Sequence, residues 1–206
     1  MHLVSRAALT AAIVICLLPV SSAAQTAKVN APAPDFTATD SHGQSHALDQ
    51  YPGKFVVLEW HNQGCPFTRK HYESGNMQNL QKEWTGKGVV WFTVISSAPG
   101  TQGYVTAPEE NEYLSKMHAA PTAALLDPDG KVGRLYNAKT TPDMYVIDPQ
   151  GKLIYSGAID NRPTPEVGDI QGADNYVSDA LSAAMSGKPV ANPYTRAYGC
   201  SVKYRE

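Results

Sequence analysis

Hydrophobic positions along the chain form two patterns, continuous runs that predict buried strands and spaced positions that predict helices. Residues 55–60 and 89–95 are almost continuous apolar, β-branched runs, which are typical of strands covered on both faces. Between them the apolar positions have helical spacing, with a proline at the start and a predicted kink near Ser74-Gly75. Together these segments predict a β-α-β unit at the centre of the fold.

Shorter elements are expected around this unit. They are a hairpin over 36–48, a loop over 96–108, a helix beginning at Pro108, short strands over 123–126, 144–147 and 153–155, and a helix over 175–185. No composition shift separates a second domain. The order of elements therefore predicts one α/β domain with an N-terminal β-hairpin and a C-terminal extension.

The first residues have the pattern of an export signal. Arg6 precedes an apolar stretch over 7–18, and small residues follow up to Ala24, an arrangement that resembles a secretory signal peptide. The apolar stretch is shorter than the ~20 residues that a membrane-spanning helix needs. We therefore expect cleavage after Ala24 and a periplasmic or secreted protein. The predicted boundaries are a signal peptide over 1–24, a mobile leader over 25–34, the domain over 35–190 and a tail over 191–206.

Charge excludes one class of partner. The chain has 17 Lys and Arg against 19 Asp and Glu, and its longest basic run is Arg69-Lys70. Nucleic-acid binding depends on the neutralisation of phosphates, so nucleic acid is not an expected partner. Contact with a membrane is expected only through an uncleaved signal peptide, and no cofactor is expected.

The cysteines are the main candidates for chemistry. Removal of the signal peptide takes Cys16 away and leaves Cys65 and Cys200 in an oxidising compartment. Cys65 lies where a strand turns into a helix, and unpaired N–H groups at a helix start stabilise a thiolate. Pro66 suits this first turn because it has no N–H to lose, and Arg69 is expected to stabilise the thiolate from the same helical face. Either Cys65 is reactive, or Cys65 and Cys200 form an inert disulfide that holds the tail, or the two cysteines never meet.

The residues around Cys65 carry a specific resemblance. The segment Leu58–Pro66 (LEWHNQGCP), the turn Asp127–Gly130 and the sequence Thr140–Pro142 resemble thioredoxin-fold redoxins, close to the peroxiredoxin-like and periplasmic thioredoxin-like proteins. The resemblance covers about 33–163 and implies a mixed central sheet with helices on both faces. In that family the proline matching Pro142 is cis and packs against the reactive sulfur. The residue before it, here Thr141, offers its backbone to an extended substrate.

The resemblance also singles out a carboxyl group. Glu59 lies six residues before Cys65, where thioredoxins have a buried carboxylate that accepts a proton. Burial raises the pKa of a carboxyl group and so suits it to proton exchange near neutral pH. The alternative is a buried ion pair between Glu59 and a neighbouring lysine or arginine.

The chain departs from both branches of the family. Thioredoxins have C-x-x-C, but here Thr68 stands in place of the second cysteine, so Cys200 is the only candidate resolving thiol. The three groups with which peroxiredoxins activate peroxide are also absent. The residues in their places are Leu58, Asn62 and Pro142.

These features predict a thiol-disulfide oxidoreductase that acts through Cys65 and is resolved by Cys200. The expected partners are protein or small-molecule thiols and disulfides, including a periplasmic reductase. Two alternatives stay open. One is a thiol peroxidase with an atypical pocket, and the other is a non-catalytic module that binds a peptide or Cu(I). His61 and His71 near Cys65 suggest copper, but the spacing is a weak match, so no metal is expected.

Overall fold

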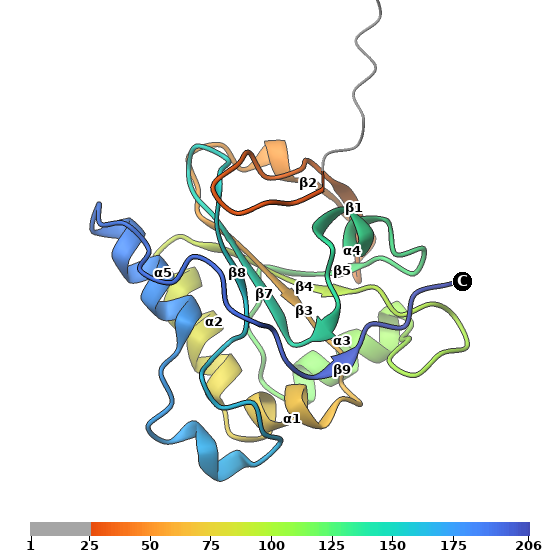
Figure 1. Ribbon diagram of the computed structural model, residues 1–206. Coiled ribbons are helices and arrows are strands. Elements are labelled where there is room, and N and C mark those ends of the chain that lie inside the picture. Colours follow the sequence, from red (N-terminus) through yellow and green to blue (C-terminus); the bar gives the residue numbers. More distant parts are fainter. Residues whose placement is uncertain (1–25) are drawn as a thin grey trace, which may run out of the picture.

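The computed structural model describes residues 26–206 and shows a seven-stranded sheet with helices on both faces (Figure 1). The predicted signal peptide over 1–24 lies outside the described residues. The strands of the sheet are β1 (Thr37–Asp40), β2 (Ser45–Ala47), β3 (Val56–Trp60), β4 (Val90–Ile95), β5 (Ala123–Leu126), β7 (Asp143–Ile147) and β8 (Leu153–Gly157). A separate two-stranded ribbon is formed by β6 (Thr140–Thr141) and β9 (Cys200–Ser201).

Strand β3 lies inside the sheet, whose order is β2-β1-β5-β4-β3-β7-β8. It runs parallel to β4 and antiparallel to β7, so the sheet is mixed, as expected. Every residue of β3 is buried because alternate side chains enter two different cores. Leu58 and Trp60 face one core, and Val57 faces the other.

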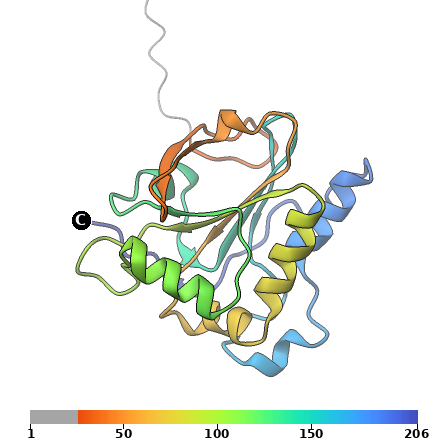
Figure 2. The ribbon, with the colours of Figure 1, turned by 180° about the vertical axis from the view of Figure 1, so that it is seen from behind.

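Helices cover both faces of this sheet (Figures 1 and 2). Their bounds are α1 (Pro66–Glu73), α2 (Asn76–Gly86), α3 (Ala107–Lys116), α4 (Lys131–Tyr136) and α5 (Tyr176–Met185), with short 3-10 helices at Leu48–Gln50 and Val167–Ile170. Side chains of α1, α2, α3 and α5 join the core that contains Val57. Tyr136 of α4 joins the core that contains Leu58 and Trp60. Within the described residues, no helix is both long and apolar enough to span a bilayer.

The predicted kink after Cys65 is a complete break between two helices. Helix α1 ends at Glu73 and α2 begins at Asn76. Gly75 between them has φ +76°, a left-handed conformation that glycine adopts at little cost. The break lets α1 and α2 follow different directions, so that α1 covers the end of β3 and α2 packs along the sheet (Figure 2).

The start of the domain differs from the expected mobile leader. Backbone hydrogen bonds join Ala27 to Leu135, Asn30 to Leu153, and Ala33 to Gly151. Ala27, Val29 and Ala33 also pack against the core. Residues 27–33 are therefore part of the packed domain, because their small apolar side chains and backbone groups find partners there.

The tail, residues 191–206, also packs on the domain. It runs along β8, where Thr195 N–H donates to Ser156, and then crosses the ends of the central strands (Figure 1). Tyr198 packs against the core on the α1 face, whereas Val202 packs against the core on the α4 face. The tail therefore passes from one face of the sheet to the other, and β9 lies at the crossing point.

Candidate active site

Cys65 is the N-cap residue of α1 and is completely buried, with 0% of its surface exposed. Its Sγ donates to the carbonyl oxygen of Thr141 at 3.0 Å. The Thr141-Pro142 bond is cis, as the resemblance implied. Strand, helix start and cis-proline loop thus meet at the sulfur. Pro66 occupies the first turn of α1, as predicted.

Cys200 lies directly beside this sulfur. Strand β9 pairs antiparallel with β6, and Cys200 is the register partner of Thr141. Both cysteines are free thiols, and each shifts the pKa of the other. The sequence separates them by 135 positions, but the tail brings them together. The backbone of Thr141, expected to receive a substrate, is thus occupied by the protein's own tail.

The two thiols differ in acidity. Burial opposes ionisation of Cys65, but hydrogen bonding by the side chains of Cys200 and Thr141 and by the backbone of Thr68 and Cys200 outweighs it, so the pKa of Cys65 falls below its ordinary value. Burial, and then the hydrogen bond and charge of Cys65, raise the pKa of Cys200 to about 12. Cys65 is therefore the more acidic thiol of the pair and the better leaving group.

Arg69 does not contribute to this thiolate. Its side chain turns along the helix and pairs with Glu73 at 2.8 Å, at a position where both side chains are about half exposed. The groups that lower the pKa of Cys65 do not include it. The prediction that Arg69 stabilises the thiolate was wrong, because the guanidinium group pairs instead with Glu73, one turn further along α1.

Glu59 is fully buried behind the thiols. It accepts hydrogen bonds from Trp91 Nε1 at 2.8 Å, Tyr72 OH at 2.8 Å and Gln81 Nε2 at 3.1 Å. Burial nevertheless raises the pKa of Glu59 to about 7. Among the described residues no lysine or arginine pairs with it, so the alternative of a buried Lys or Arg ion pair does not hold. Its contacts reach α1 through Tyr72 rather than Cys65 directly.

A second buried carboxyl group lies near Glu59 and was not predicted. Glu110 of α3 is 0% exposed, and neither carboxylate oxygen has a hydrogen-bond partner among residues 26–206. Burial, followed by the charge of Glu59, raises its pKa to about 8. His61 and Tyr113 lie in the same cluster, with ring centroids 5.2 Å apart. The acidic first turn of α3 suggested only a helix start, so no sequence signal marked Glu110 as buried.

The histidines near Cys65 are buried side chains of the domain interior. Within residues 26–206, no three His, Cys, Asp or Glu side chains are grouped to hold an ion. His71 is completely buried and hydrogen-bonds through Nδ1 to Asn76. Burial lowers the pKa of His61 to about 3, so this ring is neutral at physiological pH.

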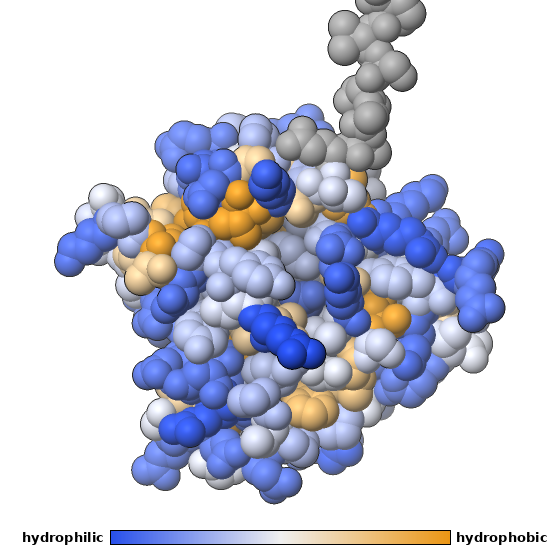
Figure 3. All heavy atoms as spheres, viewed as in Figure 1, coloured by the Kyte–Doolittle hydropathy of each residue, from blue (hydrophilic) through white to orange (hydrophobic). Residues whose placement is uncertain are grey.

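The surface over the tail is predominantly polar. In Figure 3 this face is mostly blue and white, and the orange areas are small and separated from one another. Tyr194, with 70% exposure, is the most exposed of the large hydrophobic residues. The site is thus a closed pair of thiols beneath a polar strand rather than an open apolar groove.

A mixed sheet, a buried cysteine at a helix start and a cis-proline opposite its sulfur define a thioredoxin-fold redoxin. The model of the AhpC/TSA family matches residues 29–156, which is more than half of the chain. The chain therefore belongs to the AhpC/TSA family. The match ends before the tail, so the family model does not include Cys200.

Two curated proteins are similar to the chain. A probable glutathione peroxidase 8-B from Xenopus laevis is 25% identical over 58% of this chain and 62% of that protein. The thioredoxin-like protein YneN from Bacillus subtilis is 27% identical over 59% of this chain and 66% of that protein. The chain thus spans less than two thirds of the length of either relative.

Solved structures confirm the fold. A hypothetical protein from Sinorhizobium meliloti 1021 aligns with a TM-score of 0.75 at 20% identity, covering 88% of this chain and 97% of that chain. A conserved protein from Geobacillus kaustophilus gives a TM-score of 0.73 at 23% identity, covering 86% and 93%. A thiol:disulfide interchange protein, DsbE, from Chlorobium tepidum gives 0.51 at 24% identity, covering 63% and 84%.

Proposed function

We propose that this redoxin is an exported thiol-disulfide oxidoreductase that cycles between two thiols and a Cys65–Cys200 disulfide. The observation that supports it is the strand pairing of Cys200 with Thr141, the residue whose carbonyl oxygen accepts a hydrogen bond from Cys65 Sγ. Cys200 in the tail would thus act as the resolving thiol, as the second cysteine does in C-x-x-C proteins. The partners would be protein or small-molecule thiols and disulfides, including a reductase in the same compartment.

The proposed cycle begins with Cys65. Its thiolate attacks one sulfur of a partner disulfide, an S–S bond forms to Cys65, and the other partner sulfur leaves as a thiolate. Because Cys65 is then uncharged, its contribution to the high pKa of Cys200 disappears. Cys200 loses its proton and attacks the Cys65 sulfur, and the second partner thiolate is released. Two electrons have passed to the partner, and the protein holds the disulfide.

Glu59 is the proposed proton acceptor for this cycle. Its pKa of about 7 allows it to gain and lose a proton near neutral pH. Thr141 and Pro142 are the proposed substrate-contacting residues, since the Thr141 carbonyl accepts from Cys65 Sγ and the Thr141-Pro142 bond is cis. A partner that uses the Thr141 backbone can do so only when β9 has moved away from β6, since β9 already pairs there.

The central test is a redox titration of the full chain against glutathione buffers, with the disulfide located by peptide mass spectrometry. We expect a Cys65–Cys200 bond that opens and closes reversibly within the buffer range, that is, with a potential above about −300 mV. Cys65→Ser and Cys200→Ser should each abolish it, while Cys16→Ser should titrate as the wild type. A bond that no glutathione ratio reduces would make the pair structural and contradict the proposal.

The proposed export has its own test. Expression in a Gram-negative bacterium, followed by fractionation and N-terminal mass determination, is expected to recover periplasmic protein that begins after Ala24. Protein that keeps residues 1–24 in the cytoplasmic fraction would contradict export, whatever the result at the cysteines.

A second candidate function is a thiol peroxidase, which the match to the AhpC/TSA family favours. The Cys65 thiolate would then attack one peroxide oxygen, the O–O bond would break, and hydroxide would leave, so that Cys65 becomes a sulfenic acid; Cys200 would then attack its sulfur and form the disulfide with release of water. Stopped-flow mixing of reduced protein with hydrogen peroxide separates the two functions. Oxidation no faster than that of a free cysteine would leave only disulfide exchange.

A further inference from the structure

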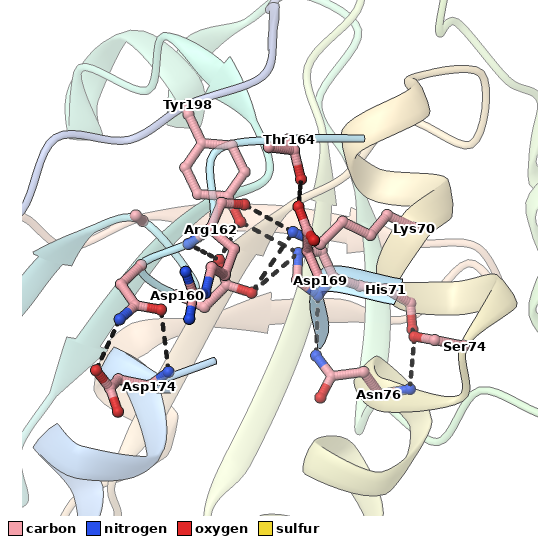
Figure 4. Close-up of polar contacts among 12 residues, drawn as sticks. Lys70, His71, Ser74, Asn76, Asp160, Arg162, Thr164, Asp169, Asp174 and Tyr198 are labelled. Carbon is pink, nitrogen blue, oxygen red and sulfur yellow. Dashed lines mark hydrogen bonds and ion pairs between the residues drawn. The ribbon is translucent and has the colours of Figure 1, made fainter. Parts of the chain in front are cut away.

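Tyr198 connects the tail to the buried interior two residues before Cys200. Its hydroxyl donates to Asp160 Oδ1 at 2.5 Å and lies 3.4 Å from His71 Nε2 (Figure 4). Burial and the adjacent Asp160 raise the pKa of Tyr198, so the hydroxyl keeps its proton and remains a donor. Tyr198 is thus fixed by a hydrogen bond to a charged acceptor, which is stronger than a bond between neutral groups.

Asp160 is itself held in place. It is 2% exposed, and the backbone N–H of Arg162 donates to its Oδ1 at 2.9 Å. The buried ammonium of Lys70 lies 3.8 Å from Asp160 Oδ2 and donates to the Arg162 carbonyl at 2.7 Å. Figure 4 shows these groups converging on Asp160. The acceptor of the Tyr198 hydroxyl is therefore part of a rigid buried network.

The ring of Tyr198 packs on the helix that carries Cys65. Phe67 meets it edge to face with centroids 5.9 Å apart, and Lys70 Nζ lies 5.6 Å from its centroid. Phe67 is two residues after Cys65, just as Tyr198 is two residues before Cys200. The Phe67–Tyr198 contact therefore joins α1 to the tail at positions two residues from each thiol.

We infer that Tyr198, through its bond to Asp160, is the positioning residue that keeps Cys200 against Cys65 and controls how often the tail opens to expose Cys65. The positioning role of Tyr198 does not depend on the proposed function. Its effect on activity does, because access to Cys65 matters only if that thiol exchanges with partners. Opening of the tail breaks the Tyr198–Asp160 bond. Loss of the bond therefore favours the open state and leaves the rest of the fold closed.

Alkylation of Cys65 in the reduced full-length protein measures this opening. A buried thiol reacts with iodoacetamide at the rate of an exposed thiol multiplied by the fraction of open molecules, and peptide mass spectrometry separates Cys65 from Cys16 and Cys200. For Tyr198→Phe we expect the Cys65 rate to rise about tenfold, the factor that one hydrogen bond to a charged acceptor supplies. Tyr194→Phe, at an exposed tail tyrosine, should leave the rate unchanged.

Global unfolding is measured in parallel by urea denaturation of the same proteins. Under the proposal Cys65 reacts faster than global unfolding allows, in both the wild type and Tyr198→Phe. If Tyr198→Phe does not fold, Phe67→Leu weakens the same contact by loss of the aromatic ring and should raise the rate about threefold. Rates that match global unfolding, or that do not change in the variants, would overturn the inference.

The outcome is independent of the redox titration. Alkylation requires no disulfide, so an accelerated Cys65 in Tyr198→Phe supports the positioning role even if the Cys65–Cys200 bond proves inert. Conversely, a reversible disulfide together with unchanged alkylation would leave the proposed function intact and remove Tyr198 from it.

Discussion

The buried surroundings of Glu110 do not stabilise an ionised carboxylate. Both of its oxygens lack partners among residues 26–206, and the nearby Glu59 carboxylate repels a second negative charge. The protonated form is therefore the stable form in the folded protein up to a pKa of about 8. In the unfolded chain the same group loses its proton near the ordinary glutamate pKa of 4.5. Folding thus takes up a proton between these values.

This linkage predicts how stability depends on pH. Between pH 4.5 and about 8 the folded state binds more protons than the unfolded state, so the free energy of unfolding falls as pH rises. Glu59, with a pKa raised to about 7, acts in the same direction. Glu110→Gln should reduce the fall in this window by up to roughly 5 kcal/mol, since each pH unit between the two pKa values contributes about 1.4 kcal/mol. Urea unfolding at several pH values measures it.

The control for this experiment is Glu112→Gln, an exposed position on the same helix. It should keep the slope of the wild type, since an exposed carboxyl group has a similar environment in both states. Equal slopes for the wild type and Glu110→Gln would mean that Glu110 titrates normally in the folded protein.

At the scale of elements, β9 depends on a glycine. Gly199 has φ +131°, and a Cβ atom there would lie 2.0 Å from the Thr141 carbonyl oxygen. The strand can therefore approach β6 closely only if position 199 has no side chain. Since the Thr141 carbonyl also accepts from Cys65, this approach sets the position of Cys200 at the thiol pair.

Gly199→Ala is accordingly expected to weaken the pairing of β9 with β6. The added methyl group must displace β9, so the equilibrium constant for Cys65–Cys200 disulfide formation should fall about tenfold or more, with roughly 1–3 kcal/mol lost from folding. The glutathione titration measures the first effect and urea unfolding the second. Gly168→Ala, where a Cβ atom would meet nothing within 4 Å, should change neither. An unchanged constant in Gly199→Ala would show that the tail accommodates the methyl group.

The elements that could be predicted from the sequence are those determined by residues within the element itself. The apolar runs of β3 and β4 and the proline at α1 were sufficient to predict the central unit, which the structure confirms. Helix α4 and the ribbon of β6 and β9 were not predicted. Strand β9 has two residues without a pattern of its own and exists only because Thr140–Thr141 lies opposite it.

The site residues also divide into those predicted from the neighbouring sequence and those that only the folded chain brings together. The place of Cys65 at the start of a helix and the burial of Glu59 followed from the strand around them, and the cis bond at Pro142 followed from the resemblance. Arg69 was misassigned because helical spacing gives the face of a side chain but not its final partner. Asp160 and Tyr198 could not be paired from sequence, since only the folded chain brings the end of β8 and the tail together.

At the scale of the whole molecule, the proposed disulfide would close a loop that contains most of the domain, from α1 to the tail. A cross-link of this length restricts the unfolded chain strongly, and chain-entropy reasoning gives roughly 4–5 kcal/mol of stabilisation. Urea unfolding of oxidised and reduced wild-type protein should show about this difference. Cys200→Ser should unfold identically under both conditions. Equal stabilities of the two wild-type forms would mean that the bond strains the native packing as much as it restricts the unfolded chain.

The distance in sequence between Cys65 and Cys200 has one more consequence. A C-x-x-C pair keeps its two sulfurs within reach of each other even in a short peptide, because the connecting loop is small. Here the same proximity is produced entirely by packing of the tail, so the effective concentration of one thiol at the other collapses when the domain unfolds. A denatured molecule would retain two separate cysteines but no dithiol. Exchange chemistry would then be confined to correctly folded copies of the protein.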